Sequence, residues 1–281
     1  MSDLKNFDRM FRLDGKVALV TGGSRGLGLH TATAFLLAGA SKVIISARKN
    51  EGPQGINQAV EKLNKLNVSG KAVGIAANVA DTKDIERLVE EVEKETGGKL
   101  DILVCNAGAT WGGPFEPTPD WSSQKVLDLN VRGVFNLARL FTSMLSKSAR
   151  PEDPSRIIIV SSVAGTTVPH VGEHGTIMYS VSKAAAHHMS RQLAVELGPR
   201  NITTNTVAPG FFPSKLANGL IEILGGEQEL KDWNPRKRLG EPEDIAGVMV
   251  YLASPAGAYV NGEDIALDGG VRYAQGRQSK L

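Results

Sequence analysis

Short apolar runs alternate with longer segments of helical periodicity along nearly the whole chain, and this alternation limits the fold more than any other feature. Most of the runs are apolar throughout, which is typical of strands buried on both faces of a parallel sheet. The helices between them must then cover both faces. We predict an α/β fold with a doubly wound parallel sheet of about seven strands flanked by helices. The apolar runs cover residues 16–20, 42–46, 71–77, 100–108, 156–162, 201–210 and 263–270.

The predicted helices fill the intervals between these runs. No linker or internal repeat divides the chain, so we expect a single domain over residues 13–272. An N-terminal extension (1–12) precedes this domain and a C-terminal tail (273–281) follows it. Two long connections, 109–119 and 211–235, are the main irregular stretches. The predicted helices cover residues 27–38, 56–66, 82–95, 123–146, 178–198 and 242–253.

Composition excludes several classes of protein. The 281 residues are 41% hydrophobic with a net charge of +2. The only basic cluster is the short PRKR at 235–238, so no nucleic-acid partner is expected. No apolar run approaches ~18 residues and the N-terminus has no secretory h-region, so we expect neither a membrane span nor a secretory signal. The single cysteine, Cys105, rules out an internal disulfide and fits a reducing compartment.

The first predicted turn has the composition of a dinucleotide site. The stretch LVTGGSRGLGLHTATAF (19–35) runs from strand through turn to helix, with Gly22, Gly26 and Gly28 at the turn and the helix opening. Glycines let the backbone approach a pyrophosphate, whose charge then meets the helix N-terminus. We therefore predict a Rossmann-type fold in which this turn, Ser24 and Leu27 included, binds the cofactor.

The choice between NAD and NADP depends on the end of the next strand. A carboxylate about 20 residues after the glycine turn binds the ribose 2′-hydroxyl of NAD. Here the strand ends with Ala47 and Arg48, and Arg25 lies inside the glycine turn. Two arginines attract a 2′-phosphate, which a carboxylate would repel. The sequence therefore predicts NADP(H).

Tyr179 and Lys183 form the candidate reactive pair. On a helix, side chains four residues apart share one face. Tyrosine ordinarily titrates near pH ~10, and an ammonium group one turn away favours its phenolate form. We expect Lys183 to lower the pKa of Tyr179, which must fall by ~3 for the phenol to act near neutral pH.

The motifs in chain order resemble those of the short-chain dehydrogenase/reductase family. The similarity extends from about residue 13 to residue 270, and it is greatest to the β-ketoacyl reductase branch, including the subgroup linked to rhamnolipid-type fatty-acid reduction. The segments ELGPRNITTNTVAPGFFPSKL and GEPEDIAGVMVYLASPAGAYVNGEDIALDGG carry the branch resemblance. The family motifs are TGGSRGLG, CNAG, LDLNVRG, SSVAG, YSVSK, APGFFPS and the closing DGG.

The resemblance implies a catalytic tetrad of Asn130, Ser162, Tyr179 and Lys183. Tyr179 would donate a proton to the developing alkoxide, and Ser162 would orient the carbonyl oxygen. Lys183 would also hold the nicotinamide ribose, and Asn130 would hold a water that links Lys183 to solvent.

Further cofactor contacts are also implied by the resemblance. The ribose shelf and the adenine site come from the ends of two strands, and the nicotinamide site comes from the segment after a third. The residues implied are Asn78, Val79, Asn106, Ala107, Gly108, Arg132, Pro209, Gly210, Phe212 and Ser214.

The chain departs from the family pattern at three places. Asn78 replaces the usual Asp, and Cys105, expected to be a buried strand-end residue, replaces the usual Asn. Sixteen residues separate Ser162 from Tyr179, more than is usual, and we expect this longer segment to border the substrate pocket.

The remaining histidines do not indicate a metal site. His170 and His174 lie in the longer segment, where two histidines and one glutamate are weak support for a metal. His187 and His188 are adjacent on a predicted helix, point in different directions and fit a structural role.

These observations predict an NADPH-dependent reductase that converts a ketone to a secondary alcohol reversibly. The leading substrates are a 3-oxoacyl thioester and a secondary-metabolite ketone. Two alternatives remain open: an enoyl- or dienoyl-CoA reductase, and a catalytically silent NADP-binding partner protein. The family resemblance implies a homo-oligomer, either a dimer or a tetramer.

The sequence also predicts a cellular location. The final residues Ser279, Lys280 and Leu281 form the S-K-L tripeptide that a peroxisomal import receptor recognises. We therefore expect the protein in peroxisomes, with this receptor as a partner.

Overall fold

The computed structural model describes residues 6–214 and 218–274, and the predicted targeting tripeptide Ser279–Leu281 lies outside them. Within these residues, seven parallel strands form one sheet in the order β3-β2-β1-β4-β5-β6-β7. This confirms the predicted doubly wound sheet. The strands are β1 (Val17–Thr21), β2 (Lys42–Ala47), β3 (Lys71–Ala76), β4 (Ile102–Cys105), β5 (Ser155–Val160), β6 (Ile202–Pro209) and β7 (Asp264–Leu267).

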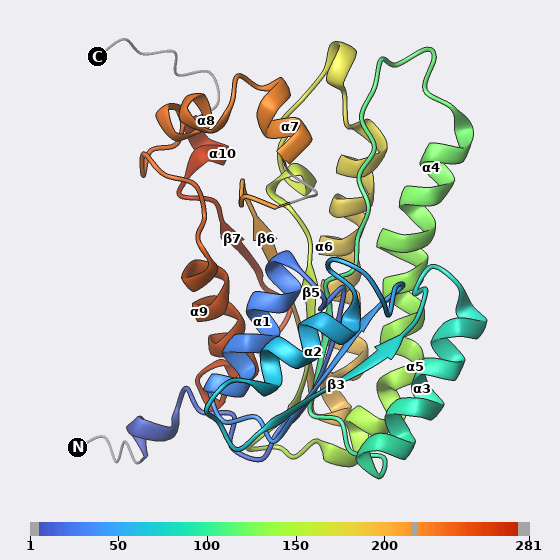
Figure 1. Ribbon diagram of the computed structural model, residues 1–281, viewed down its shortest axis with the longest axis vertical. Helices are drawn as coiled ribbons and strands as arrows, with labels where there is room; N and C mark the ends of the chain where they lie inside the picture. Colours follow the sequence, from blue (N-terminus) through green and yellow to red (C-terminus); the bar gives the residue numbers. More distant parts are fainter. Residues whose placement is uncertain (1–5, 215–217, 275–281) are drawn as a thin grey trace.

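Helices cover both faces of the sheet (Figure 1). One buried core lies between the sheet and α1, α2 and α9, and a second lies between the sheet and α3, α5 and α6. The α-helices are α1 (Gly26–Leu37), α2 (Ile56–Asn64), α3 (Thr82–Thr96), α4 (Asp120–Leu127), α5 (Val134–Ser148), α6 (Ile177–Leu197), α7 (Asn218–Ile223), α8 (Glu227–Trp233), α9 (Pro242–Ala253) and α10 (Val271–Ala274). Short 3-10 helices are η1 (Phe7–Arg9), η3 (Val163–Gly165), η4 (Gly172–His174), η5 (Gly198–Arg200) and η6 (Pro255–Gly257).

The helix predicted over residues 123–146 is not continuous. It is divided into α4 and α5 by the π-helical segment η2 (Asp128–Gly133). Another chain segment lies close to the end of η2, because a Cβ at Gly133 would lie 2.3 Å from the Val79 carbonyl oxygen. A π turn accommodates an additional residue, and such turns are frequent at functional sites.

Burial follows position in the sheet. The central strands β1, β4 and β5 are buried along their whole length, as their apolar runs predict. The edge strands differ, since only Ala72 and Ile75 of β3 are buried and β7 is partly exposed throughout. Their side chains have a neighbouring strand on one side only.

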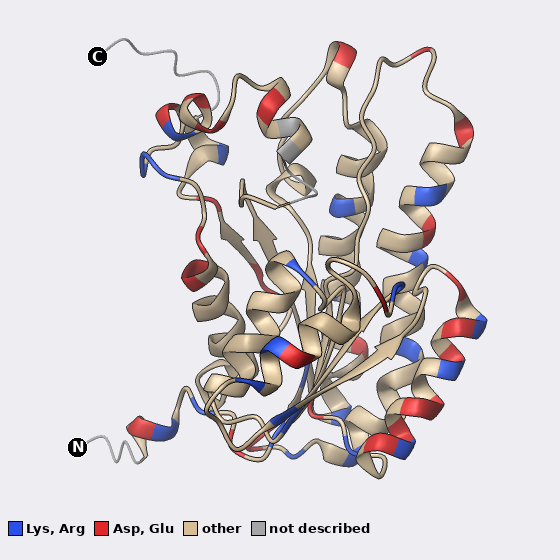
Figure 2. Ribbon diagram, viewed as in Figure 1, with Lys and Arg blue, Asp and Glu red and all other residues tan. Residues whose placement is uncertain are grey.

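Charged residues lie along several helices, α3 and α8 among them. Figure 2 shows acidic and basic residues interleaved along α3, whose Ile85, Leu88 and Val92 are buried against the sheet. No helix in the described ranges is long and apolar enough to cross a bilayer. Helices α7, α8 and α10 lie beyond the carboxyl ends of β6 and β7 (Figure 1).

Candidate active site

A cavity of about 2600 Å³ opens at the carboxyl edge of the sheet. The strand order reverses between β1 and β4 at this edge, and doubly wound folds bind their ligands at such a point. Most residues predicted to bind the cofactor line the cavity. They are Gly22, Ser24, Arg25, Gly26, Leu27, Arg48, Asn78, Val79, Asn106, Ala107, Gly108, Tyr179, Lys183, Pro209, Gly210, Phe212 and Ser214.

Asn106, which follows β4, holds the glycine turn after β1 through hydrogen bonds. Its Nδ2 donates to the carbonyl oxygens of Thr21 (2.9 Å) and Gly22 (3.2 Å). A Cβ at Gly22 would lie 2.7 Å from that nitrogen, and one at Gly28 would lie 2.4 Å from the Gly22 carbonyl oxygen. Only glycine fits at either position, and the turn leads into the N-terminus of α1, so the residues fit a dinucleotide pyrophosphate.

Two arginines line the cavity beyond β2. Arg48 follows this strand and Arg25 lies in the glycine turn, and both are exposed. Arg25 Nη1 donates to Gln54 Oε1 at 2.9 Å. Ala47 stands where a carboxylate would bind a ribose 2′-hydroxyl, so the local charge fits a 2′-phosphate. Gln54 was not predicted, because it lies in a loop whose only sequence signal is its proline and glycine content.

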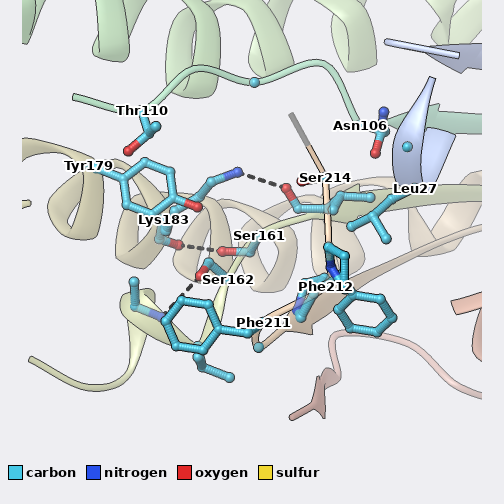
Figure 3. A pocket seen from close by; sticks show the side chains of 18 of the residues that line it. Leu27, Asn106, Thr110, Ser161, Ser162, Tyr179, Lys183, Phe211, Phe212 and Ser214 are labelled. Atoms are coloured by element: carbon cyan, nitrogen blue, oxygen red, sulfur yellow. Dashed lines mark hydrogen bonds between the residues drawn. The ribbon is translucent and has the colours of Figure 1, made fainter. Parts of the chain in front are cut away.

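Helix α6 brings Tyr179 and Lys183 together, as their spacing predicts. Lys183 Nζ lies 5.7 Å from the centre of the Tyr179 ring and donates to the Val160 carbonyl oxygen at 2.9 Å. Figure 3 shows the Tyr179 side chain beside Thr110 and above Ser162. Thr110 also lines the cavity and was not predicted, since it lies beyond the CNAG motif.

The protonation of this pair differs from the expectation. Burial raises the pKa of Tyr179, and a hydrogen bond with the Ser162 side chain offsets part of this effect. Burial also lowers the pKa of Lys183 to about 8. The expected lowering of the Tyr179 pKa is therefore corrected, because loss of hydration outweighs the attraction of the nearby ammonium group. Tyr179 is a phenol at neutral pH, which is the form that donates a proton.

Ser162 follows β5 and begins the 3-10 helix η3. Its Oγ accepts a hydrogen bond from the Ala164 N–H at 3.2 Å, and its side chain is hydrogen-bonded with the Tyr179 hydroxyl. The neighbouring Ser161 Oγ donates to the Lys183 carbonyl oxygen at 3.0 Å. This bond joins the end of β5 to α6 and brings Ser162 to the same part of the cavity as Tyr179.

Asn130 is buried in η2 and supports the loop after β4. Its Oδ1 accepts from the Ala109 N–H at 2.9 Å, and its Nδ2 donates to the Ala109 carbonyl oxygen at 2.8 Å. The same Nδ2 donates to Ser182 Oγ at 3.0 Å, and Ser182 Oγ donates to the Tyr179 carbonyl oxygen at 2.7 Å. Asn130 thus connects this loop to α6. Its expected role in holding a water stays a prediction.

Three predicted site residues do not line the cavity: Gly28, Asn130 and Arg132. Gly28 and Asn130 support residues that do. Arg132 Nε donates to Asp128 Oδ1 at 2.9 Å, and its Nη2 donates to the Ala80 carbonyl oxygen at 3.0 Å. The assignment of Arg132 to the cofactor site stays a prediction. Its side chain fastens η2 to the loop after β3.

The longer segment between Ser162 and Tyr179 borders the cavity. Val168, His170 and His174 line it, and the His170 ring lies 6.3 Å from the Phe211 ring between centroids. Among residues 6–214 and 218–274, no group of three or more His, Cys, Asp or Glu side chains is placed to hold a metal ion.

The two other departures from the family pattern lie near the cofactor region. Cys105 is buried, which raises the pKa of its thiol to about 12 and makes it unreactive at neutral pH. Asn78 lines the cavity, and its Oδ1 accepts from the Ala80 N–H at 3.4 Å. Its contact with adenine stays a prediction.

Comparison with known proteins agrees with this geometry. The family model described as "Enoyl-(Acyl carrier protein) reductase" matches residues 22–272. A short-chain dehydrogenase/reductase of Pestalotiopsis microspora is 36% identical over 92% of this chain and 96% of its own length. The chain belongs to the short-chain dehydrogenase/reductase family. It is therefore an oxidoreductase by family.

Two other similarities are informative about the branch of this short-chain dehydrogenase/reductase. The rhamnolipids biosynthesis 3-oxoacyl-[acyl-carrier-protein] reductase of Pseudomonas aeruginosa is 39% identical over 92% of this chain and 97% of its own length. The solved Pseudomonas aeruginosa RhlG/NADP active-site complex is 37% identical, with a TM-score of 0.85 over 94% of this chain and 99% of that one. That relative holds the cofactor predicted here, NADP.

Proposed function

We propose that this protein is an NADPH-dependent reductase that converts a ketone to a secondary alcohol, with a 3-oxoacyl thioester as the leading substrate class. One observation carries the proposal. Tyr179, Lys183 and Ser162 meet in the cavity whose other end is formed by the glycine turn and two arginines. An acid and a cofactor site thus share one enclosed space.

The chain's own residues supply the binding and the proton. The Ser162 hydroxyl donates a hydrogen bond to the ketone oxygen and fixes the orientation of the carbonyl group. NADPH, when bound, supplies the hydride for the carbonyl carbon. Tyr179 gives its phenolic proton to the same oxygen, so that C=O becomes CH–OH. Lys183 lies one turn away, and its positive charge stabilises the phenolate left on Tyr179.

The substrate class is supported by similarity and by the cavity wall. The bacterial relative named above is a 3-oxoacyl-[acyl-carrier-protein] reductase by its name. In this chain, Val168, Phe211 and Ile223 provide apolar surface in the cavity, which fits an acyl chain. A secondary-metabolite ketone is the second candidate for the same reaction.

Two other functions stay open as alternatives. Reduction of an enoyl- or dienoyl-CoA is favoured by the description of the matching family model. The tyrosine and lysine pair favours the ketone instead, since a ketone oxygen needs a proton donor beside it. A catalytically silent NADP-binding protein is disfavoured by the same pair.

The test is a spectrophotometric assay of NADPH oxidation with matched thioesters. A 3-oxoacyl-CoA, the same 3-oxoacyl group on acyl carrier protein, and the corresponding trans-2-enoyl-CoA are compared, with simple ketones as a second panel. We expect oxidation with the 3-oxo compounds and none above background with the enoyl compound. Turnover of the enoyl thioester alone would favour reduction of an enoyl- or dienoyl-CoA. No turnover with any compound would favour the catalytically silent NADP-binding protein.

We also propose a peroxisomal location, which rests on the sequence Ser279–Leu281 alone. The measurement is the cellular distribution of a fluorescent protein fused ahead of the full chain or of residues 1–278. Import that persists without the tripeptide would contradict the proposal.

A further inference from the structure

His187 lies directly behind the candidate catalytic serine. It belongs to α6, one turn after Lys183, and is 2% exposed. The neighbouring His188 is exposed, so the two histidines point in different directions, as their positions predict. His187 does not line the cavity and cannot touch a substrate there. Any role in the reaction must pass through another residue.

The His187 ring bridges two segments that are distant in sequence. Its Nε2 lies 3.3 Å from the Ser162 carbonyl oxygen, and its Nδ1 lies 2.8 Å from Asp264 Oδ1, an ion-pair distance outside linear hydrogen-bond geometry. The second oxygen of Asp264 is paired with Arg191, one turn further along α6. The ring is thus held between the first residue of β7 and the main chain of Ser162.

The direction of the contact to Ser162 is fixed by its chemistry. A carbonyl oxygen only accepts, so His187 must carry a hydrogen on Nε2. The same carbonyl oxygen also accepts from the Gly165 N–H at 3.0 Å. Two donors therefore hold the peptide group of Ser162, and this residue lines the cavity beside Tyr179.

The turn after Ser162 packs directly on the same ring. A Cβ at Gly165 would lie 2.6 Å from His187 Cδ2 and 2.7 Å from the Lys183 carbonyl carbon. Glycine at this position lets η3 contact α6 without a side chain between them. The turn that follows Ser162 thus packs against both the His187 ring and the main chain of Lys183.

We propose that His187 is a positioning residue for Ser162, with Asp264 and Arg191 holding its ring. This inference rests on the proposed function, in which the Ser162 hydroxyl binds the ketone oxygen. A displacement of about 1 Å in such a group costs up to roughly a hundredfold in rate. The loss affects kcat, because the hydrogen bond to the oxygen strengthens as negative charge develops in the transition state.

The first test compares His187→Leu with the control His188→Leu, which makes the same change at the exposed neighbour. We expect His187→Leu to lower kcat by roughly 10- to 100-fold, with the KM for the 3-oxoacyl thioester and the Kd for NADPH within about twofold of wild type. His188→Leu should match wild type. His187→Gln can still donate to the Ser162 carbonyl oxygen and should recover most of the lost kcat.

A double-mutant cycle tests the role of Asp264. Asp264→Ala should lower kcat in the wild-type background and have no further effect in the His187→Leu background, because both changes disturb the same ring. If His187→Leu does not fold, His187→Gln serves as the second background, and Asp264→Ala alone must still lower kcat without changing the Kd for NADPH.

Several results would overturn the inference. They are an unchanged kcat in His187→Leu or in Asp264→Ala, equal losses in His187→Gln and His187→Leu, and additive losses in the cycle. If the proposed function is wrong, wild type and His188→Leu will both fail to reduce any ketone. That result would also overturn the proposed role of His187.

Discussion

Tyr179 differs from phenylalanine only in the hydroxyl that would donate the proton. Tyr179→Phe keeps the ring that packs beside Lys183, so we expect folding and NADPH binding to stay close to wild type. Turnover of the ketone should fall by at least ~10²-fold, the usual scale for general acid catalysis. The measurements are kcat for the 3-oxoacyl thioester and NADPH binding by fluorescence. A variant that retains more than half of its turnover would exclude Tyr179 as the acid.

Arg48 is the residue most directly placed to select the cofactor. A charge-assisted hydrogen bond contributes ~1.5–3 kcal/mol, so Arg48→Ala should raise the KM for NADPH by roughly 10- to 100-fold. NADH lacks the 2′-phosphate and serves as the internal control, with a KM that barely changes. Because Arg48 is exposed, the preference for NADPH should decline with salt. Equal losses with both cofactors would show that Arg48 only shapes the loop.

Single residues were predictable where their partners are close in sequence. The spacing of Tyr179 and Lys183 on one helix was enough to place them together, and the glycine turn required only its strand and helix. The contact of His187 with Ser162 and Asp264 was not predictable, because three separate elements bring it about. The contact of Arg132 with the Ala80 carbonyl oxygen was not predictable for the same reason, since Ala80 lies after β3.

At the scale of elements, η2 is the main departure from the predicted helices, and another chain segment lies close to it. The apolar periodicity of residues 123–146 predicts one helix. It contains no information about the Val79 carbonyl oxygen that lies close to Gly133. The alternation of runs and helices predicted all seven strands, since each buried strand carries its own signal. An irregular segment within a helix, such as η2, has no periodic pattern of apolar residues by which the sequence could predict it.

The close approach at η2 gives a prediction for Gly133→Ala. A Cβ there would lie 2.3 Å from the Val79 carbonyl oxygen, so the helix or the loop must shift. Overpacking of this kind costs roughly 1–3 kcal/mol, and the shift should also displace Asn130 and reduce kcat. Urea unfolding and the ketone assay measure the two effects.

Gly247→Ala is the matched control for that change. Gly247 lies within α9, and nothing lies within 4 Å of a Cβ at this position. Alanine there should raise the free energy of unfolding by roughly 0.5–1 kcal/mol. Similar stabilities for the two variants would mean that η2 adapts to a side chain at position 133.

At the scale of the whole molecule, the cavity is assembled from loops far apart in the sequence. The glycine turn, the segment before α6 and the region of α7, α8 and α10 all contribute to its wall. The sheet order places the cofactor end of this space, and the sequence predicts it well. The substrate end depends on how the irregular segments pack together, so sequence patterns predicted only that the longer segment before Tyr179 would border it.

The free energy of unfolding of the whole molecule should depend on pH because the Lys183 ammonium group is buried. Burial lowers the pKa of Lys183 from 10.5 to about 8. Between these two values the unfolded chain holds a proton that the folded protein has released, so the free energy of unfolding rises with pH. Burial raises the pKa of Cys105 from 9.0 to about 12, and this effect lowers stability as the thiol of the unfolded chain ionises around pH 9. The contribution of Lys183 is therefore the difference between wild type and a variant that lacks its ammonium group.

We expect the free energy of unfolding, measured in urea without nucleotide, to rise from pH 8 to pH 9 by about 1 kcal/mol more in the wild-type protein than in Lys183→Met. One released proton changes it by at most ~1.4 kcal/mol per pH unit, and the Lys183 ammonium is already half titrated at pH 8. Lys183→Met keeps the buried stem without the charge, so its stability should lack the Lys183 contribution over the same interval and be higher than that of wild type at pH 7. The same change in both proteins would place any titrating group elsewhere. It would mean that the ammonium remains solvated through the cavity, and Lys183 would then hold its charge throughout the pH range of the assay.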